Sequence, residues 1–92
     1  MTVDEIKLAL RVTSEVYEPE IRALAMAGIA DLQIAGITAA SSLEDLTDPL
    51  ECQAVKTYVR AHFGSPADYD RLAASYETQK AQLMHATGHT TW

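Results

Sequence analysis

A helix stop and a helix start lie side by side at residues 63–68 of this chain, with an apolar helical pattern on each side. Gly64 can adopt the left-handed conformation that ends a helix, and Ser65 can accept hydrogen bonds from the free N–H groups that begin the next one. Pro66 has the fixed φ of a first helical residue. The sequence therefore predicts two helices that meet at a tight corner and pack as an antiparallel pair.

The length of 92 residues and the 48% apolar content predict one small helical domain over residues 1–92. Fifteen of the apolar residues are alanines, which let helices approach closely but bury little area per side chain. A core of this kind is only marginally stabilising, so burial against partners would add stability.

The acidic start Met1–Glu5 and the lack of a long apolar run predict a soluble protein with no signal peptide and no membrane contact. The single cysteine, Cys52, cannot form an internal disulfide and fits a reducing compartment, as expected for a protein made in a cytoplasm.

Seven basic and thirteen acidic residues give a formal charge of −6, and no basic run occurs. Sequence-specific nucleic-acid binding is therefore not expected, because nothing would neutralise the phosphates. The same charge suits another role beside DNA: an acidic channel wall repels the polymer and lets it slide without sticking.

Apolar residues at three- and four-residue steps predict an all-α bundle. Capping signals support the helix starts, with Thr2 and Glu5 in a capping box and proline at the first helical positions Pro19 and Pro49. The four principal helices are predicted roughly over residues 3–12, 19–35, 49–63 and 66–86, with a connection over 37–47 and a flexible tail over 87–92.

Gly28 lies within the apolar stripe of the second predicted helix. A glycine inside a helix costs about 1 kcal/mol relative to alanine, so we expect close approach of a neighbouring helix or subunit there. Tyr58, Tyr69 and Tyr76 lie on the inner stripes of the next two helices. They are predicted to belong to the core or its rim, where their hydroxyls could bond across a subunit boundary.

The sequence predicts no catalytic residue, no metal site and no cofactor. His85 and His89 are four apart, but Gly88 interrupts the helix between them and no nearby cysteine or acid completes a ligand set. Cys52 and His62 lie about 15 Å apart on a straight helix, too far for a nucleophile and its base. The chain is therefore not expected to be an enzyme.

The acidic residues Glu44 and Asp45 lie in the predicted connection, where helix capping and a solvated loop explain them. The functional alternative is that these two acids face a DNA channel.

A family resemblance extends over nearly the whole chain. Its strongest element is the succession of a helix, an acidic loop, a second helix and the Phe-Gly corner. The residues that carry it lie in four segments: Ile6–Val12, Ala30–Leu32, Ala54–Gly64 and Asp70–Leu83. In these segments the chain resembles the small helical head–tail connector proteins of long-tailed bacteriophages and prophages, also called adaptor, head-completion or DNA-packaging proteins.

The resemblance implies a ring of identical subunits, typically a dodecamer, in the virion at the junction of head and tail. Such a ring docks beneath the portal protein, extends the DNA channel and presents a face to a stopper or tail-completion protein. It also implies that the C-terminal segment reaches the portal, which makes these residues the docking candidates: Thr87, Gly88, His89, Thr90, Thr91 and Trp92.

Two alternatives stay open. Trp92 could pack back onto its own bundle instead of docking into a partner. The whole chain could also be a small acidic regulatory protein or DNA mimic that binds one protein partner.

Overall fold

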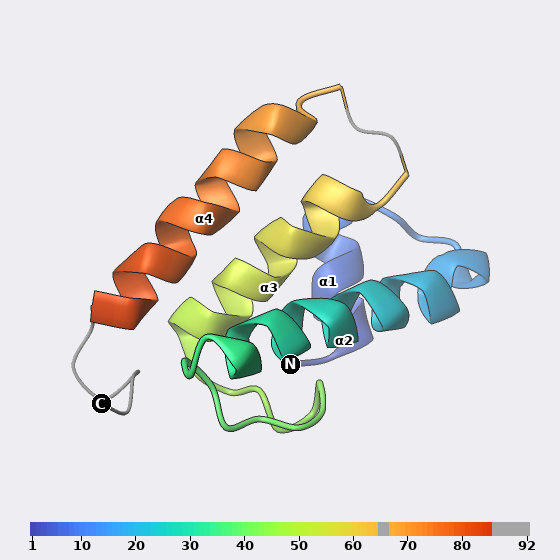
Figure 1. Cartoon of the computed structure of the whole chain (residues 1–92). Helices are drawn as coiled ribbons and strands as arrows, with labels where there is room; N and C mark the ends of the chain where they lie inside the picture. The colour runs from blue at the N-terminus through green and yellow to red at the C-terminus, as the bar shows by residue number, and fades with distance from the viewer. Residues whose placement is uncertain (65–66, 86–92) are drawn as a thin grey trace.

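The computed structural model describes residues 1–64 and 67–85 (Figure 1). Within these ranges the chain forms four α-helices and one short 3₁₀ helix, and no strand is present. The all-α fold class expected from the sequence is confirmed. In chain order the elements are α1 (Val3–Leu10), η1 (Glu15–Tyr17), α2 (Glu18–Ile34), α3 (Pro49–His62) and α4 (Tyr69–His85).

The helix ends follow the capping signals in the sequence. The Thr2 side chain accepts from the Glu5 N–H at 3.3 Å, and Asp48 accepts from two N–H groups at the start of α3. Gly36, which follows α2, and Gly64, which follows α3, have φ values of 76° and 67°. This left-handed conformation ends a helix at little cost when the residue is glycine.

Helix α1 is shorter than the predicted range 3–12, and the segment after it is more ordered than expected. Arg11 adopts φ 59°, and its N–H turns back to the carbonyl of Leu8 at 3.2 Å, which ends the helix at Leu10. The short helix η1 was not expected from the sequence; it begins where the Ser14 hydroxyl accepts from the Val16 N–H at 3.2 Å.

Helix α4 begins at Tyr69, not at residue 66, so the predicted start was wrong. Ala67 and Asp68 form a turn, and the carbonyl of Asp68 accepts from the Leu72 N–H at 3.0 Å as the first helical bond. Ser65 and Pro66, to which the predicted cap was assigned, lie outside the described residues, as does residue 86 at the predicted end.

Helix α3 contacts each of the other three α-helices, with α2 and α4 packed antiparallel to it (Figure 1). The core therefore forms around α3. Small residues allow the helices to approach, since Ala25 on α2 and Ala54 on α3 are both completely buried. The largest fully buried side chains are Ile6, Ile21, Ile29, Leu32, Leu43, Leu46, Val55, Val59 and Leu83.

The connection between α2 and α3 contributes to this core. Its apolar residues Ile37, Leu43 and Leu46 are buried. The amino group of Met1 donates to the carbonyls of Leu43 at 3.2 Å and Leu46 at 2.6 Å, so the N-terminus secures the connection against the bundle.

Candidate functional site

A hollow of about 210 Å³ opens between α3 and α4 and reaches α2. It brings together the three tyrosines singled out from the sequence, from two different helices. We call this hollow the aromatic groove, and its lining residues are Asp31, Tyr58, Ala61, His62, Tyr69, Ala73, Tyr76 and Glu77.

The aromatic side chains of the groove form one continuous row. The ring of Tyr58 lies 5.2 Å from that of Tyr76 and 4.4 Å from that of His62, and His62 lies 5.7 Å from Tyr69. Tyr58 and His62 are four residues apart on α3 and so share a face of that helix. Edge-to-face and tilted contacts of this kind stabilise aromatic pairs, so each ring helps to fix the position of its neighbour.

Gly28 fixes the position of this row from α2. A Cβ added to Gly28 would lie 3.1 Å from Cδ1 of Tyr58, closer than ordinary van der Waals contact. The missing side chain therefore lets the Tyr58 ring lie directly against the backbone of α2.

A polar contact ties α2 to α4 at the edge of the groove. Oδ2 of Asp31 accepts from the Tyr76 hydroxyl at 2.5 Å and from Nζ of Lys80 at 3.0 Å. Burial raises the pKa of Asp31, but the bonds from Tyr76 and Lys80 outweigh it, and the net pKa is lowered. Burial, followed by the bond to Asp31, raises the pKa of Tyr76 far above its ordinary value. The pair is therefore a carboxylate and a neutral phenol at neutral pH.

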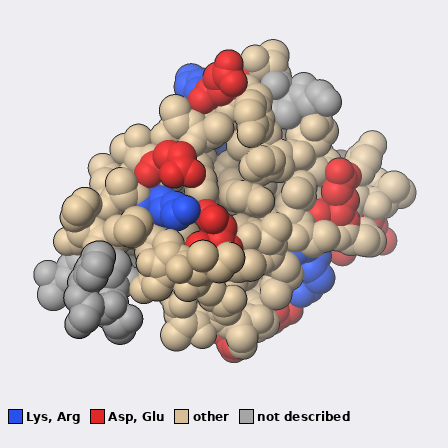
Figure 2. Space-filling view, in the orientation of Figure 1, with Lys and Arg blue, Asp and Glu red and all other residues tan. Residues whose placement is uncertain are grey.

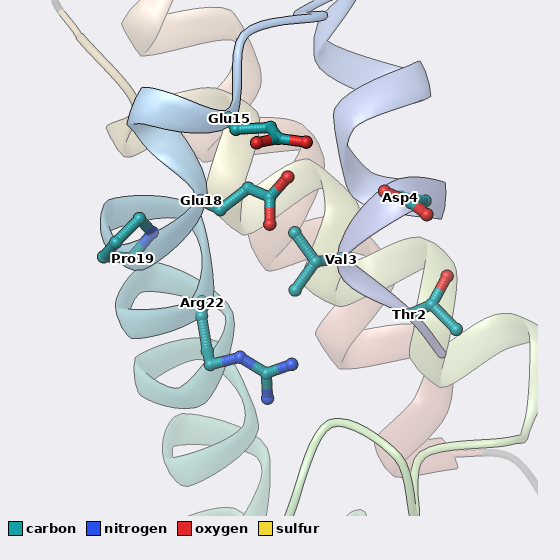
Figure 3. Close-up of a pocket in the computed structure, with 7 residues that line it drawn as sticks. All are labelled: Thr2, Val3, Asp4, Glu15, Glu18, Pro19 and Arg22. Carbon is teal, nitrogen blue, oxygen red and sulfur yellow. The ribbon is translucent and has the colours of Figure 1, made fainter.

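A second, larger hollow of about 640 Å³ lies where α1 faces η1 and the start of α2 (Figure 3). We call it the acidic hollow; its lining residues are Thr2, Val3, Asp4, Glu15, Glu18, Pro19 and Arg22. Glu18 is paired with Lys7 at 2.8 Å, and this hydrogen bond is the main reason that the pKa of Lys7 is raised. No aromatic ring is among the lining residues.

The proposed channel acids Glu44 and Asp45 are both exposed and lie in the connection before α3. Glu44 accepts from Arg22 at 3.1 Å; a hydrogen bond to its own backbone and the Arg22 bond lower its pKa. Asp45 accepts from the Ser41 hydroxyl at 3.2 Å, and its N–H donates to Ser42 at 3.3 Å. Both acids therefore contribute to local structure, and a channel-facing role stays a prediction.

One end of the bundle carries exposed aliphatic side chains. Helix α2 ends, α3 begins and α4 ends there (Figure 1). Ile34, the last residue of α2, is 86% exposed, and Leu50 near the start of α3 is 60% exposed. We call this region the apolar end; it includes a hollow of about 170 Å³ lined by Leu50, Gln53, Gln79, Gln82 and Leu83.

The predicted portal-docking residues Thr87, Gly88, His89, Thr90, Thr91 and Trp92 lie outside the described residues. The described chain stops at His85, the last residue of α4 and part of the same end of the bundle. Cys52 is half-buried, and its thiol donates to the Leu46 carbonyl at 3.4 Å. Burial raises its pKa, which keeps the sulfur in the unreactive thiol form.

Within residues 1–64 and 67–85, no group of three or more His, Cys, Asp or Glu side chains could hold a metal ion. In the same part of the chain, no helix has the length and apolar character needed to span a membrane.

The contact of Asp31 with Lys80 and the place of His62 in the groove were not expected from the sequence. For Lys80 the sequence does hold a signal, because Tyr76 and Lys80 are four residues apart and therefore share a face of α4. Buried donors are usually hydrogen-bonded, so two donors on one face of a helix favour an acceptor on the helix packed against that face. The sequence did not say that Asp31 was that acceptor, because this depends on how α2 crosses the bundle.

A comparison with known proteins found no matching family, no matching curated protein and no matching solved structure. The chain's own residue pattern and geometry are therefore what support a function.

Proposed function

We propose that this protein is a head–tail connector of a long-tailed bacteriophage or prophage and works by assembly, without chemistry of its own. In this role it forms a ring, a dodecamer in the particle, beneath the portal protein. The ring extends the DNA channel and offers a docking face to the stopper or tail-completion protein.

The apolar end is the observation that carries this proposal. Ile34 and Leu50 leave aliphatic surface in water at the end of the bundle where the chain continues toward Trp92. Exposed apolar surface beside a hollow is typical of a protein–protein contact, and a domain this small gains stability by burying it. We therefore assign the portal contact to this end and to residues 87–92.

The charge of the molecule supports a place beside DNA. The formal charge is −6. On the face shown in Figure 2 the basic side chains lie next to acidic ones instead of forming a basic patch. Such a surface does not hold phosphates, as a channel wall requires. Glu44 and Asp45 are the acids that we place toward the channel.

Deletion of Gly88–Trp92 tests the role of the tail. We expect the truncated protein to keep the circular dichroism spectrum and melting temperature of the full chain, because the core described above ends at α4. We expect it to fail to attach to filled heads, as seen by electron microscopy of the protein mixed with its portal. Truncated protein that still completes particles would show that the tail assignment is wrong.

Substitutions on the apolar end test the assembly surface separately. We expect Ile34→Ser and Leu50→Ser to weaken ring formation on the portal without unfolding the monomer. Leu8→Ser is the matched control, because Leu8 is 80% exposed and its neighbours Ala9 and Leu10 lie beside Phe63, at the opposite end of α3 from Leu50. A wild-type protein that ignores the portal at every concentration and binds one DNA-binding protein would instead favour the acidic regulator or DNA mimic.

A further inference from the structure

The aromatic groove combines two features that recognise an organic cation: the faces and edges of aromatic rings, and carboxylates at its margin. Three tyrosines and one histidine line it, together with Asp31 of α2 and Glu77 of α4. Cations are attracted by the negative face of an aromatic ring, and the attraction grows where water is partly excluded. The groove therefore favours a positively charged group over a neutral or anionic one.

Both carboxylates can accept further hydrogen bonds. The two bonds to Asp31 are made at Oδ2, which leaves Oδ1 as an acceptor. Within the described residues no lysine or arginine lies within ion-pair distance of Glu77. Among the described residues, the groove therefore has one acid without an ion pair, Glu77, beside its rings, in addition to Asp31, which is paired with Lys80 at 3.0 Å. In the same part of the chain the acidic hollow also has acids without an ion pair, but it has no aromatic ring to accompany them.

The shape of the groove favours a planar cation. Ala61 and Ala73 leave room between α3 and α4, and Tyr69, 44% exposed, stands at the margin of the groove. A guanidinium group is planar, stacks on aromatic rings and donates two parallel hydrogen bonds to a carboxylate, whereas an ammonium group acts as a point charge. A metal ion is disfavoured, because the described residues hold no group of three ligating side chains.

We propose that the aromatic groove binds an arginine side chain presented by a different, basic protein. A basic protein is a better source than a second copy of this chain, because this chain has only seven lysines and arginines against thirteen acids. Two of its four arginines, Arg22 and Arg71, are already paired with Glu44 and Asp68. This site is separate from the apolar end and does not depend on the connector role.

The test uses N-acetyl-arginine amide as the probe and nuclear magnetic resonance of the full, isotope-labelled chain as the readout. We expect saturable shifts confined to the groove, with a dissociation constant on the order of 1 mM for a single side chain. N-acetyl-citrulline amide has nearly the same shape without the charge, and we expect it to bind about tenfold more weakly or not at all.

Variants locate the site. We expect Glu77→Gln and Tyr69→Ala each to weaken arginine binding about fivefold or more, while Tyr69→Phe, which keeps the ring, binds like wild type. Glu20→Gln, which removes an exposed acid of α2 that does not line the groove, is the matched control and should change nothing. Melting temperatures confirm that each variant is folded.

Three results would overturn the proposal. Citrulline could bind as well as arginine, which would remove the role of charge. Glu77→Gln and Tyr69→Ala could both bind like wild type, which would place the probe elsewhere. The groove signals could shift on simple dilution of the free protein, which would make a second copy the occupant.

Discussion

The acidic hollow and the aromatic groove differ in what surrounds them. The acidic hollow is about three times larger, at about 640 Å³ against 210 Å³, and is lined by more acids. Its walls are the short α1, η1 and the start of α2, and its lining side chains are small, aliphatic or charged. The aromatic groove lies between two long helices and is lined by rings that contact one another. The larger and more acidic hollow is therefore not the one with the packed aromatic rings.

The difference arises from how each region is held together. Around the groove, Gly28 seats the Tyr58 ring, and Asp31 ties α2 to the Tyr76 hydroxyl of α4. Around the acidic hollow, the charged contacts are the ion pairs of Lys7 with Glu18 and of Arg22 with Glu44. The ion pair of Asp31 with Lys80 at the groove is about as exposed as that of Lys7 with Glu18, so the difference lies in the packed rings and in the buried Tyr76 that donates to Asp31. Four experiments test whether the two regions differ in this way.

The largest effect is expected from Gly28→Leu. The new side chain would displace the Tyr58 ring and force α2 and α3 apart, at a cost of about 2 to 3 kcal/mol in the free energy of unfolding. Urea denaturation measures this cost. Ala27→Leu is the matched control, since Ala27 is the exposed neighbour on α2 and should tolerate leucine. A normal melting temperature for Gly28→Leu would remove the close-contact argument.

Tyr76→Phe should have the next largest effect. The ring stays, but the hydroxyl that donates to Asp31 is lost, and a buried hydrogen bond to a charged group contributes about 1 to 2 kcal/mol. The same denaturation experiment on Tyr69→Phe is the control, because Tyr69 is 44% exposed, against 5% for Tyr76. Equal stability of the two variants would show that the contact between α2 and α4 adds nothing.

Acid should weaken the same contact. The pKa of Asp31 is lowered below its ordinary value of 3.8 in the folded protein, so its stabilising contribution is present above that value. The contribution is lost as the pH falls through the lowered pKa, because the folded state must then take up a proton. We expect the stability gap between wild type and Asp31→Asn to be largest near pH 7 and to shrink below pH 3.8. A gap for Glu77→Gln with the same pH profile would contradict this assignment.

The smallest effect is expected from Lys7→Met, which removes the ion pair with Glu18 beside the acidic hollow. The pKa of Lys7 is raised above its ordinary value of 10.5, so the stabilising contribution persists at neutral pH and is lost only in strong alkali. Thermal denaturation should show a smaller loss than for Tyr76→Phe. A larger loss would reverse the comparison and make the N-terminal region the better fixed of the two.

Much of the fold could be predicted from local signals. Caps at Thr2 and Asp48 and left-handed glycines at Gly36 and Gly64 mark helix ends, because each acts on backbone groups within a few residues. The start of α4 was predicted less well. Pro66 favours a helix that begins at residue 66, but residues 67 and 68 form a turn and the regular helix begins at Tyr69.

The connection between α2 and α3 shows a different limit. The lack of a helical period predicts a connection here, and no α-helix forms in it. Leu43 and Leu46 are nevertheless fully buried, and their carbonyls accept hydrogen bonds from the amino group of Met1. Burial of a loop residue depends on what the rest of the chain places over it, and residue spacing carries no such information.

Local patterns in the sequence are enough to show that this chain is a small acidic bundle of helices, where most of those helices begin and end, and that Gly28, Tyr58 and Tyr76 lie on inner faces. These properties depend on residue spacing and on capping groups only a few positions apart. The packing of the helices is needed to show that Asp31 accepts from Tyr76 and Lys80, and that three tyrosines and His62 line one groove. Those contacts join residues far apart in the chain, so they depend on the packing of α2, α3 and α4.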